Sequence, residues 1–124
     1  MVMNMIPETF NDVLETLNVP LAAIADLGSG EVQIIGDPEV VDNTDLISTL
    51  FADKETVESL NRSLEGQILP RAWSQGKVSC IVCKPTVETI VGLFVMDDLD
   101  AVQQYHWSKK ANEAIRLSFS ASAS

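Results

Sequence analysis

The sequence is poor in positive charge. Its 124 residues include 8 Lys and Arg against 18 Asp and Glu, which gives a formal net charge of −10 at pH 7. Proteins that bind nucleic acid place clustered cations against phosphates, and anionic membranes attract basic segments in the same way. The cations here are scattered along the chain, with one adjacent pair at Lys109 and Lys110. The sequence therefore predicts neither a nucleic-acid partner nor attachment to an anionic membrane.

Long apolar runs and cysteines are also scarce. No run reaches the ~20 apolar residues that a membrane-spanning helix requires. Residues 1–6 lack the charged start and the apolar stretch of a secretory signal. We therefore expect a cytoplasmic protein without direct membrane insertion. Its two cysteines are too few for a disulfide framework and stay reduced in that compartment.

Apolar residues are nevertheless frequent enough to build a core. Hydrophobic residues make up 46% of the chain and charged residues 21%, which is typical of a globular domain. A chain of this length forms one domain and needs no metal or disulfide to hold it together. We assign residues 1–119 to this domain. Residues 120–124 are rich in Ser and Ala and are expected to fray.

The first half of the chain predicts a helix, two strands and a second helix. Residues 7–18 begin at a proline and repeat apolar residues at spacings of three and four, as a short amphipathic helix does. Residues 21–34 read as two short strands joined by a glycine-containing turn, which indicates a β-hairpin. The apolar stripe over residues 45–64 predicts a middle helix, with a bend or break at 53–55.

The second half predicts three strands and a closing helix. Residues 68–74 form the first strand, although Pro70 cannot donate to a ladder and belongs at a sheet edge. Residues 77–84 are rich in β-branched side chains. Residues 89–96 are the most apolar run, which is typical of a central strand covered on both faces. With a final helix over 99–119, the pattern favours an α+β domain in which helices cover both faces of one antiparallel sheet.

Cys80 and Cys83 have the C-x-x-C spacing of redox and zinc sites. Such sites need the two sulfurs to converge, usually at a helix start or a tight turn. On a strand, residues three apart face opposite sides of the sheet. We favour two ordinary half-buried cysteines, and a metal, redox or nucleophilic role is the alternative.

The other reactive residues form no recognisable catalytic set. The single histidine, His106, has no partner that would mark a Cys–His pair. The glycine turn at 28–30 leads into a strand, whereas phosphate-binding loops lead into a helix. The acidic residues 97–100 suit helix capping and lack the mid-loop glycine of a calcium site. We therefore expect no enzymatic activity, no metal and no cofactor.

Apolar residues near Trp73 are the best candidate for an interaction surface. Trp73 either folds over the core or anchors an interface, where tryptophan is enriched. An edge strand at this place would also be able to pair with another chain. The candidate partner or dimer residues lie on this strand and on the middle helix: Leu60, Leu64, Ile68, Leu69, Arg71 and Trp73.

The order of these elements resembles the Roadblock / dynein-light-chain domain over residues 7–119. Three stretches carry the likeness: the first helix with the hairpin that follows it, the strand at 76–82, and the strand at 89–95 with the last helix. The resemblance implies a five-stranded antiparallel sheet of order 2-1-5-4-3. It places the middle helix on one face of the sheet and the terminal helices on the other.

The resemblance also implies a function. Members dimerise through the third strand and the middle helix, and their characteristic partners are small Ras-like GTPases or larger protein complexes. It implies a regulatory or scaffold module here, either a homodimer or one half of a paralogous heterodimer. Pro70 would limit pairing by the third strand, and Arg62 and Arg71 match a catalytic arginine only by residue type. The alternatives are a PAS- or GAF-like domain that senses a small ligand, and an enzyme with a cysteine nucleophile.

Overall fold

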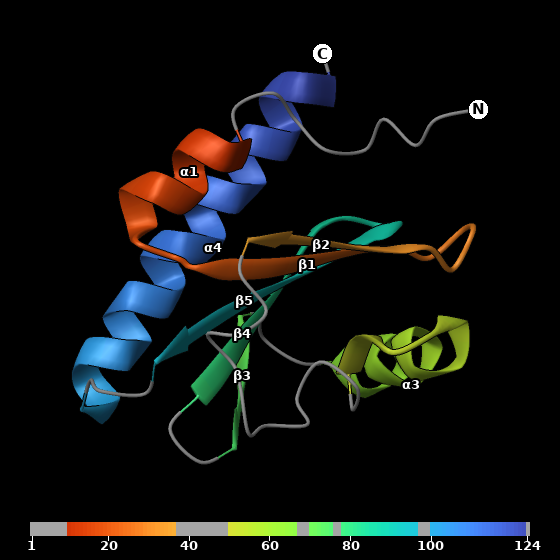
Figure 1. The fold of residues 1–124 in the computed structure, drawn as a ribbon, viewed down its shortest axis with the longest axis horizontal. Helices are drawn as coiled ribbons and strands as arrows, with labels where there is room; N and C mark the ends of the chain where they lie inside the picture. Colours follow the sequence, from red (N-terminus) through yellow and green to blue (C-terminus); the bar gives the residue numbers. More distant parts are fainter. Residues whose placement is uncertain (1–9, 37–49, 67–69, 76–77, 97–99, 124) are drawn as a thin grey trace.

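The computed structural model describes residues 10–36, 50–66, 70–75, 78–96 and 100–123. Figure 1 shows the chain as one sheet with helices on both sides. The helices and strands are α1 (Phe10–Leu17), β1 (Leu21–Asp26), β2 (Val32–Gly36), α3 (Lys54–Leu64), β3 (Arg71–Gln75), β4 (Val78–Thr86), β5 (Thr89–Met96) and α4 (Ala101–Ala123).

The five strands form a single antiparallel sheet in the order β2-β1-β5-β4-β3. β5 lies in the centre, paired with β1 on one side and β4 on the other. β2 and β3 are the two edge strands. The α+β class, the five-stranded sheet and the strand order 2-1-5-4-3 expected from the sequence are confirmed.

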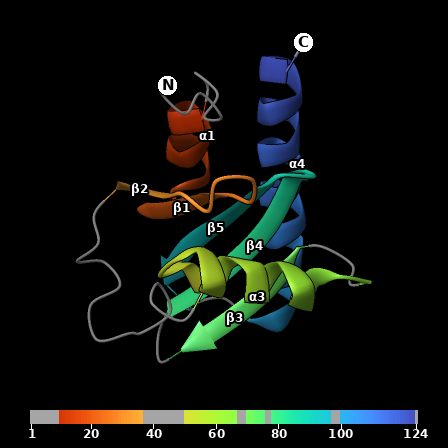
Figure 2. The same ribbon diagram turned by 90° about the vertical axis from the view of Figure 1, so that its right-hand side faces the viewer.

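Each face of the sheet has its own core. α3 covers one face, while α1 and α4 cover the other (Figures 1 and 2), as expected. Side chains along β4 alternate between the two: Cys80 belongs to the cluster under α3, and Ile81 to the cluster under α1 and α4. β5 alternates in the same way. Its apolar run is therefore buried on both faces, as the composition of residues 89–96 indicates.

The break expected near residues 53–55 is a helix start. Leu50 and Phe51 are helical, and a new helix, α3, begins at Lys54. Asp53 caps it: its Oδ1 accepts a hydrogen bond from the Thr56 amide at 2.9 Å, and its own amide donates to Thr56 Oγ1 at 2.9 Å. This reciprocal pair satisfies two donors at the helix start. The cap turns the chain so that Phe51 and α3 both reach the sheet.

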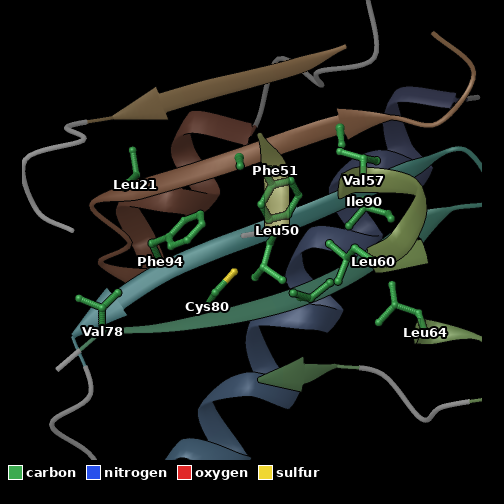
Figure 3. Close-up of a cluster of buried hydrophobic side chains, with 13 residues drawn as sticks. Leu21, Leu50, Phe51, Val57, Leu60, Leu64, Val78, Cys80, Ile90 and Phe94 are labelled. Atoms are coloured by element: carbon green, nitrogen blue, oxygen red, sulfur yellow. The ribbon is translucent and has the colours of Figure 1, made fainter. Parts of the chain in front are cut away.

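Phe51 reaches the centre of the sheet because Gly92 has no side chain. A Cβ on Gly92 would lie 2.6 Å from a ring carbon of Phe51 and 3.0 Å from the Cys80 sulfur. The Phe51 ring packs edge-on against Phe94, with ring centroids 6.2 Å apart. Figure 3 shows Phe51 over the strands, beside Cys80 and Phe94. Gly92 thus fixes how closely this layer approaches the sheet.

Several element boundaries differ from the sequence expectation. β3 begins at Arg71, so Pro70 precedes the strand, and residues 68–69 lie outside the described residues. β4 continues to Thr86 through an irregularity between Cys83 and Thr86, which admits the proline at 85. α4 runs to Ala123, so it includes residues for which the sequence favours a frayed tail.

The tight fit at Gly92 gives a first prediction. Gly92→Ala should lower the free energy of unfolding by about 1–3 kcal/mol, because the added methyl group must displace the Phe51 ring. Urea unfolding followed by circular dichroism measures the change. Gly28→Ala is the matched control, since its Cβ would meet nothing closer than 3.6 Å. Equal stability of the two variants would contradict the close packing at Gly92.

Candidate protein-interaction surface

β3 is an edge strand with one unpaired side. Its five residues pair with β4, in register from Arg71 opposite Val82 to Gln75 opposite Val78. Among the residues that the structure describes, no other strand pairs with β3. An edge of this kind presents a row of backbone N–H and C=O groups that can pair with another chain.

Side chains of β3 alternate between the two faces of the sheet. Trp73 lies opposite Cys80 and packs against the cluster under α3. Ala72 lies opposite Ile81, which faces α1 and α4. Trp73 is therefore folded onto the core, one of its two expected roles, and is only partly buried there.

The structure brings together part of the residue set proposed from the sequence. Leu60, Leu64 and Trp73 belong to one cluster, where Leu60 is 4% exposed and Leu64 is 6% exposed. Arg71 lies on the edge strand and is exposed. Leu60 and Leu64 thus hold α3 against the sheet, and a partner would meet the outer side of the helix. Ile68 and Leu69 lie outside the described residues.

The outer side of α3 is polar and carries residues of both charges. Its exposed residues are Lys54, Glu55, Glu58, Ser59, Arg62 and Ser63. Arg62 Nη2 donates to Ser59 Oγ at 3.0 Å, and Lys84 Nζ on β4 donates to Asn61 Oδ1 at 2.8 Å. We call α3's exposed residues, together with the open edge of β3, the β3–α3 surface. Figure 2 shows α3 lying across the sheet near β3.

A groove lies on the other side of β3, between this strand and α4. It has a volume of about 480 Å³. Its lining consists of Pro70, Arg71, Ala72, Ala101, Gln104, Tyr105, Ser108 and Lys109. Sequence reasoning did not find it, because the two walls lie about thirty residues apart. The one signal in the sequence is the aromatic residue Tyr105 within the final helix, and only the structure shows that it is 58% exposed.

The two cysteines are fully buried, which corrects the expectation that they are half-buried. Cys80 and Cys83 are both 0% exposed and free of disulfides. They belong to different clusters on opposite faces of the sheet, so their sulfurs do not converge. Burial raises the pKa of the Cys83 thiol to about 12, and burial with the neighbouring Cys83 raises the pKa of Cys80 further. Both thiols stay protonated at neutral pH, where the thiolate is the reactive form.

The other residues considered for chemistry either cap a helix or lie exposed on its surface. Asp100, from the acidic stretch 97–100 that suits helix capping, caps α4, and its Oδ1 accepts a hydrogen bond from the Gln103 amide at 2.8 Å. His106 is exposed beside Tyr105. Within the described ranges, no three His, Cys, Asp or Glu residues group to hold a metal ion. No described helix has the length and apolarity to cross a membrane.

Comparison with known proteins identifies the fold. No protein-family model matches the sequence, and no curated protein does. Among solved structures, MglB of Myxococcus xanthus is 14% identical, with a TM-score of 0.54 over 89% of this chain and 90% of that one. A structure of MglB with a tetrameric arrangement is 13% identical, with a TM-score of 0.55 over 93% and 88%.

A Roadblock/LC7 domain from Streptomyces avermitilis is 18% identical and has a TM-score of 0.45 over 80% of this chain and 83% of that one. The chain has the fold of MglB. The Roadblock-type architecture expected from the sequence is thereby confirmed.

The buried thiols give a second prediction. A maleimide reagent should label native protein at pH 8 far more slowly than urea-unfolded protein, because both thiols are covered and protonated. Raising the pH from 8 to 10 should accelerate labelling only in urea, where the thiols ionise near their ordinary pKa of about 8.5. Mass spectrometry counts the labels. Rapid labelling of Cys80 or Cys83 in the native protein would instead favour the cysteine-nucleophile alternative.

Proposed function

We propose that this chain is a dimerising regulatory or scaffold module that binds a small Ras-like GTPase. The observation that carries the proposal is the fold itself, with an open β3 edge beside the middle helix α3. In the Roadblock-type domains that the sequence resembles, these two elements form the dimer contact. The structural likeness to MglB supports the same assignment.

The dimer would form by antiparallel pairing of β3 with β3 of a second copy. Residues Arg71–Gln75 supply the strand, and Pro70 precedes it, so the missing proline amide costs no hydrogen bond within β3. Such pairing would join two sheets into one of ten strands. The partly buried Trp73 at the edge is the residue type that anchors interfaces. The tetrameric arrangement of MglB supports association as a property of this fold.

The module would act by binding and not by catalysis. The described residues offer buried, protonated thiols and no metal-holding cluster. Arg62 donates to Ser59 within its own helix, and Arg71 lies on the edge strand. Regulation would then come from which state of the GTPase the module prefers.

No observation favours a sensory domain of the PAS or GAF type. Such a domain binds its ligand between sheet and helix, in a cavity with a few polar groups. Here the described part of that space holds packed apolar side chains on both faces of β5. Ile90, Val91, Leu93 and Phe94 are all 0% exposed.

The proposed dimer gives a third prediction. Wild-type protein should have twice the monomer mass of 13.5 kDa in light scattering at micromolar concentration. Trp73→Glu should shift it toward the monomer, because a carboxylate at an edge blocks strand pairing. Gln33→Glu places the same charge on the opposite edge strand and should leave the dimer intact.

Thermal melts establish that both variants fold, and Arg71→Glu provides a second edge variant should Trp73→Glu unfold. A wild-type chain that stays monomeric would contradict homodimerisation. If it then associates with a paralogous chain, the heterodimer form of the proposal holds.

The proposed partner gives a fourth prediction. The immobilised protein should retain a purified small Ras-like GTPase from the same genome when the GTPase is loaded with either GDP or a GTP analogue, and should prefer one nucleotide state. Biolayer interferometry measures both affinities. Equal binding of the two states would indicate a tether, while no binding of any such GTPase in either state would refute the proposal.

A further inference from the structure

The groove between β3 and α4 differs in charge from the rest of the molecule. The chain carries a net charge of −10, yet none of the eight residues that line the groove is acidic. Two of them, Arg71 and Lys109, are cationic. The register sets Arg71 opposite Val82, which belongs to the cluster under α3, so Arg71 borders the groove at the strand edge while its side chain belongs to the other face of the sheet. Lys109, on the α4 wall, is therefore the cation of the groove itself.

Beyond the groove, the exposed charged residues of α4 are also mainly cationic. This helix presents Lys109, Lys110 and Arg116 against one carboxylate, Glu113, which forms an ion pair with Arg116. At the start of α4, the described residues include one further carboxylate, Asp100, which caps the helix. By contrast, α1 carries acidic residues and no cation. Among the described residues, the exposed side of α4 thus carries more cations than carboxylates.

Lys109 is held in position by Tyr105. Its Nζ donates a hydrogen bond to the Tyr105 hydroxyl at 3.4 Å and lies 5.3 Å from the centre of the ring. Tyr105 is one turn earlier on α4 and is 58% exposed. An exposed tyrosine beside a fixed cation is a combination that binding sites favour, because the rigid ring supplies area at low entropic cost.

The floor of the groove combines apolar and polar groups. Pro70, Ala72 and Ala101 provide small apolar surfaces. Gln104 Nε2 donates to Ser79 Oγ at 3.2 Å, and Ser79 also shares a hydrogen bond with Ser74 at 2.8 Å. These bonds fix the α4 wall to the sheet, so the groove is formed before any ligand arrives. Small aliphatic side chains of a ligand would fit the apolar part.

We propose that this groove binds an acidic peptide in extended conformation, with a carboxylate directed to Lys109 and aliphatic side chains on Pro70, Ala72 and Ala101. Lys109, and a lining without any acidic residue, select an anionic ligand, and the small apolar residues of the lining suit the aliphatic side chains of a peptide. The site lies on the face opposite α3, so the proposal goes beyond the β3–α3 surface and does not require dimerisation.

The test is fluorescence anisotropy with a short labelled peptide of alternating Glu and Leu. Wild-type protein should bind it with an affinity that falls as salt rises. Lys109→Glu should weaken binding by about tenfold or more, since it reverses the charge at the groove wall. Lys110→Glu makes the same change one residue further along α4, outside this groove, and should alter the affinity by about twofold at most.

A second pair of variants measures how much the Tyr105 ring contributes to peptide affinity. Tyr105→Ala should weaken binding severalfold, whereas His106→Ala, also exposed on α4, should leave it unchanged. Circular dichroism melts establish that the variants are folded.

The companion peptides define what would overturn the proposal. A peptide with Gln in place of Glu should bind weakly, and so should oligoglutamate, which lacks the aliphatic side chains. Equal binding of oligoglutamate would show attraction by charge alone, and equal effects of Lys109→Glu and Lys110→Glu would place the peptide outside the groove. Either result refutes the site. Neither outcome bears on GTPase binding, which is measured separately.

Discussion

The burial of β5 on both faces is the constraint on which the rest of the structure depends. A strand with no polar face needs neighbours on both sides and a helical layer above and below it. β1 and β4 supply the neighbours, α3 the layer on one face, and α1 with α4 the layer on the other. Gly92 then lets Phe51 reach the middle of the sheet. Once these demands are met, β2 and β3 are left as edges.

The interaction chemistry follows from that geometry. The interior of the sheet is committed to packing, so the strands that remain able to pair are those at the edges. β3 differs from β2 in packing its Trp73 against the cluster under α3 on one face and in bordering the groove with α4 on the other. Cys80 and Cys83, by contrast, lie on the interior strand β4. Their spacing resembles that of a redox motif, but a position inside β4 sends the sulfurs to opposite cores and keeps them protonated.

The fold could be predicted from the sequence because each element has a local signature. The spacing of apolar residues marks the helices, and the uninterrupted run at 89–96 marks the centre of the sheet. The surface was harder to predict. Leu60 and Leu64 have the same helical spacing whether they face a partner or the core, and only the packing of α3 shows that they face the core. The groove could not be predicted, because Ala72 and Lys109 come together only through the pairing of β3 with β4 and the docking of α4.

The alternation of β3 joins the two surfaces physically. Arg71 and Trp73 belong to the α3 face, while Ala72 and Ser74 belong to the face of α4, so one five-residue strand borders both sites. Side chains on opposite faces do not compete for the same space. They do share the backbone of β3, and the pairing of all five of its residues with β4 holds both sites in place before either ligand arrives. The short edge strand is therefore the element on which both sites depend.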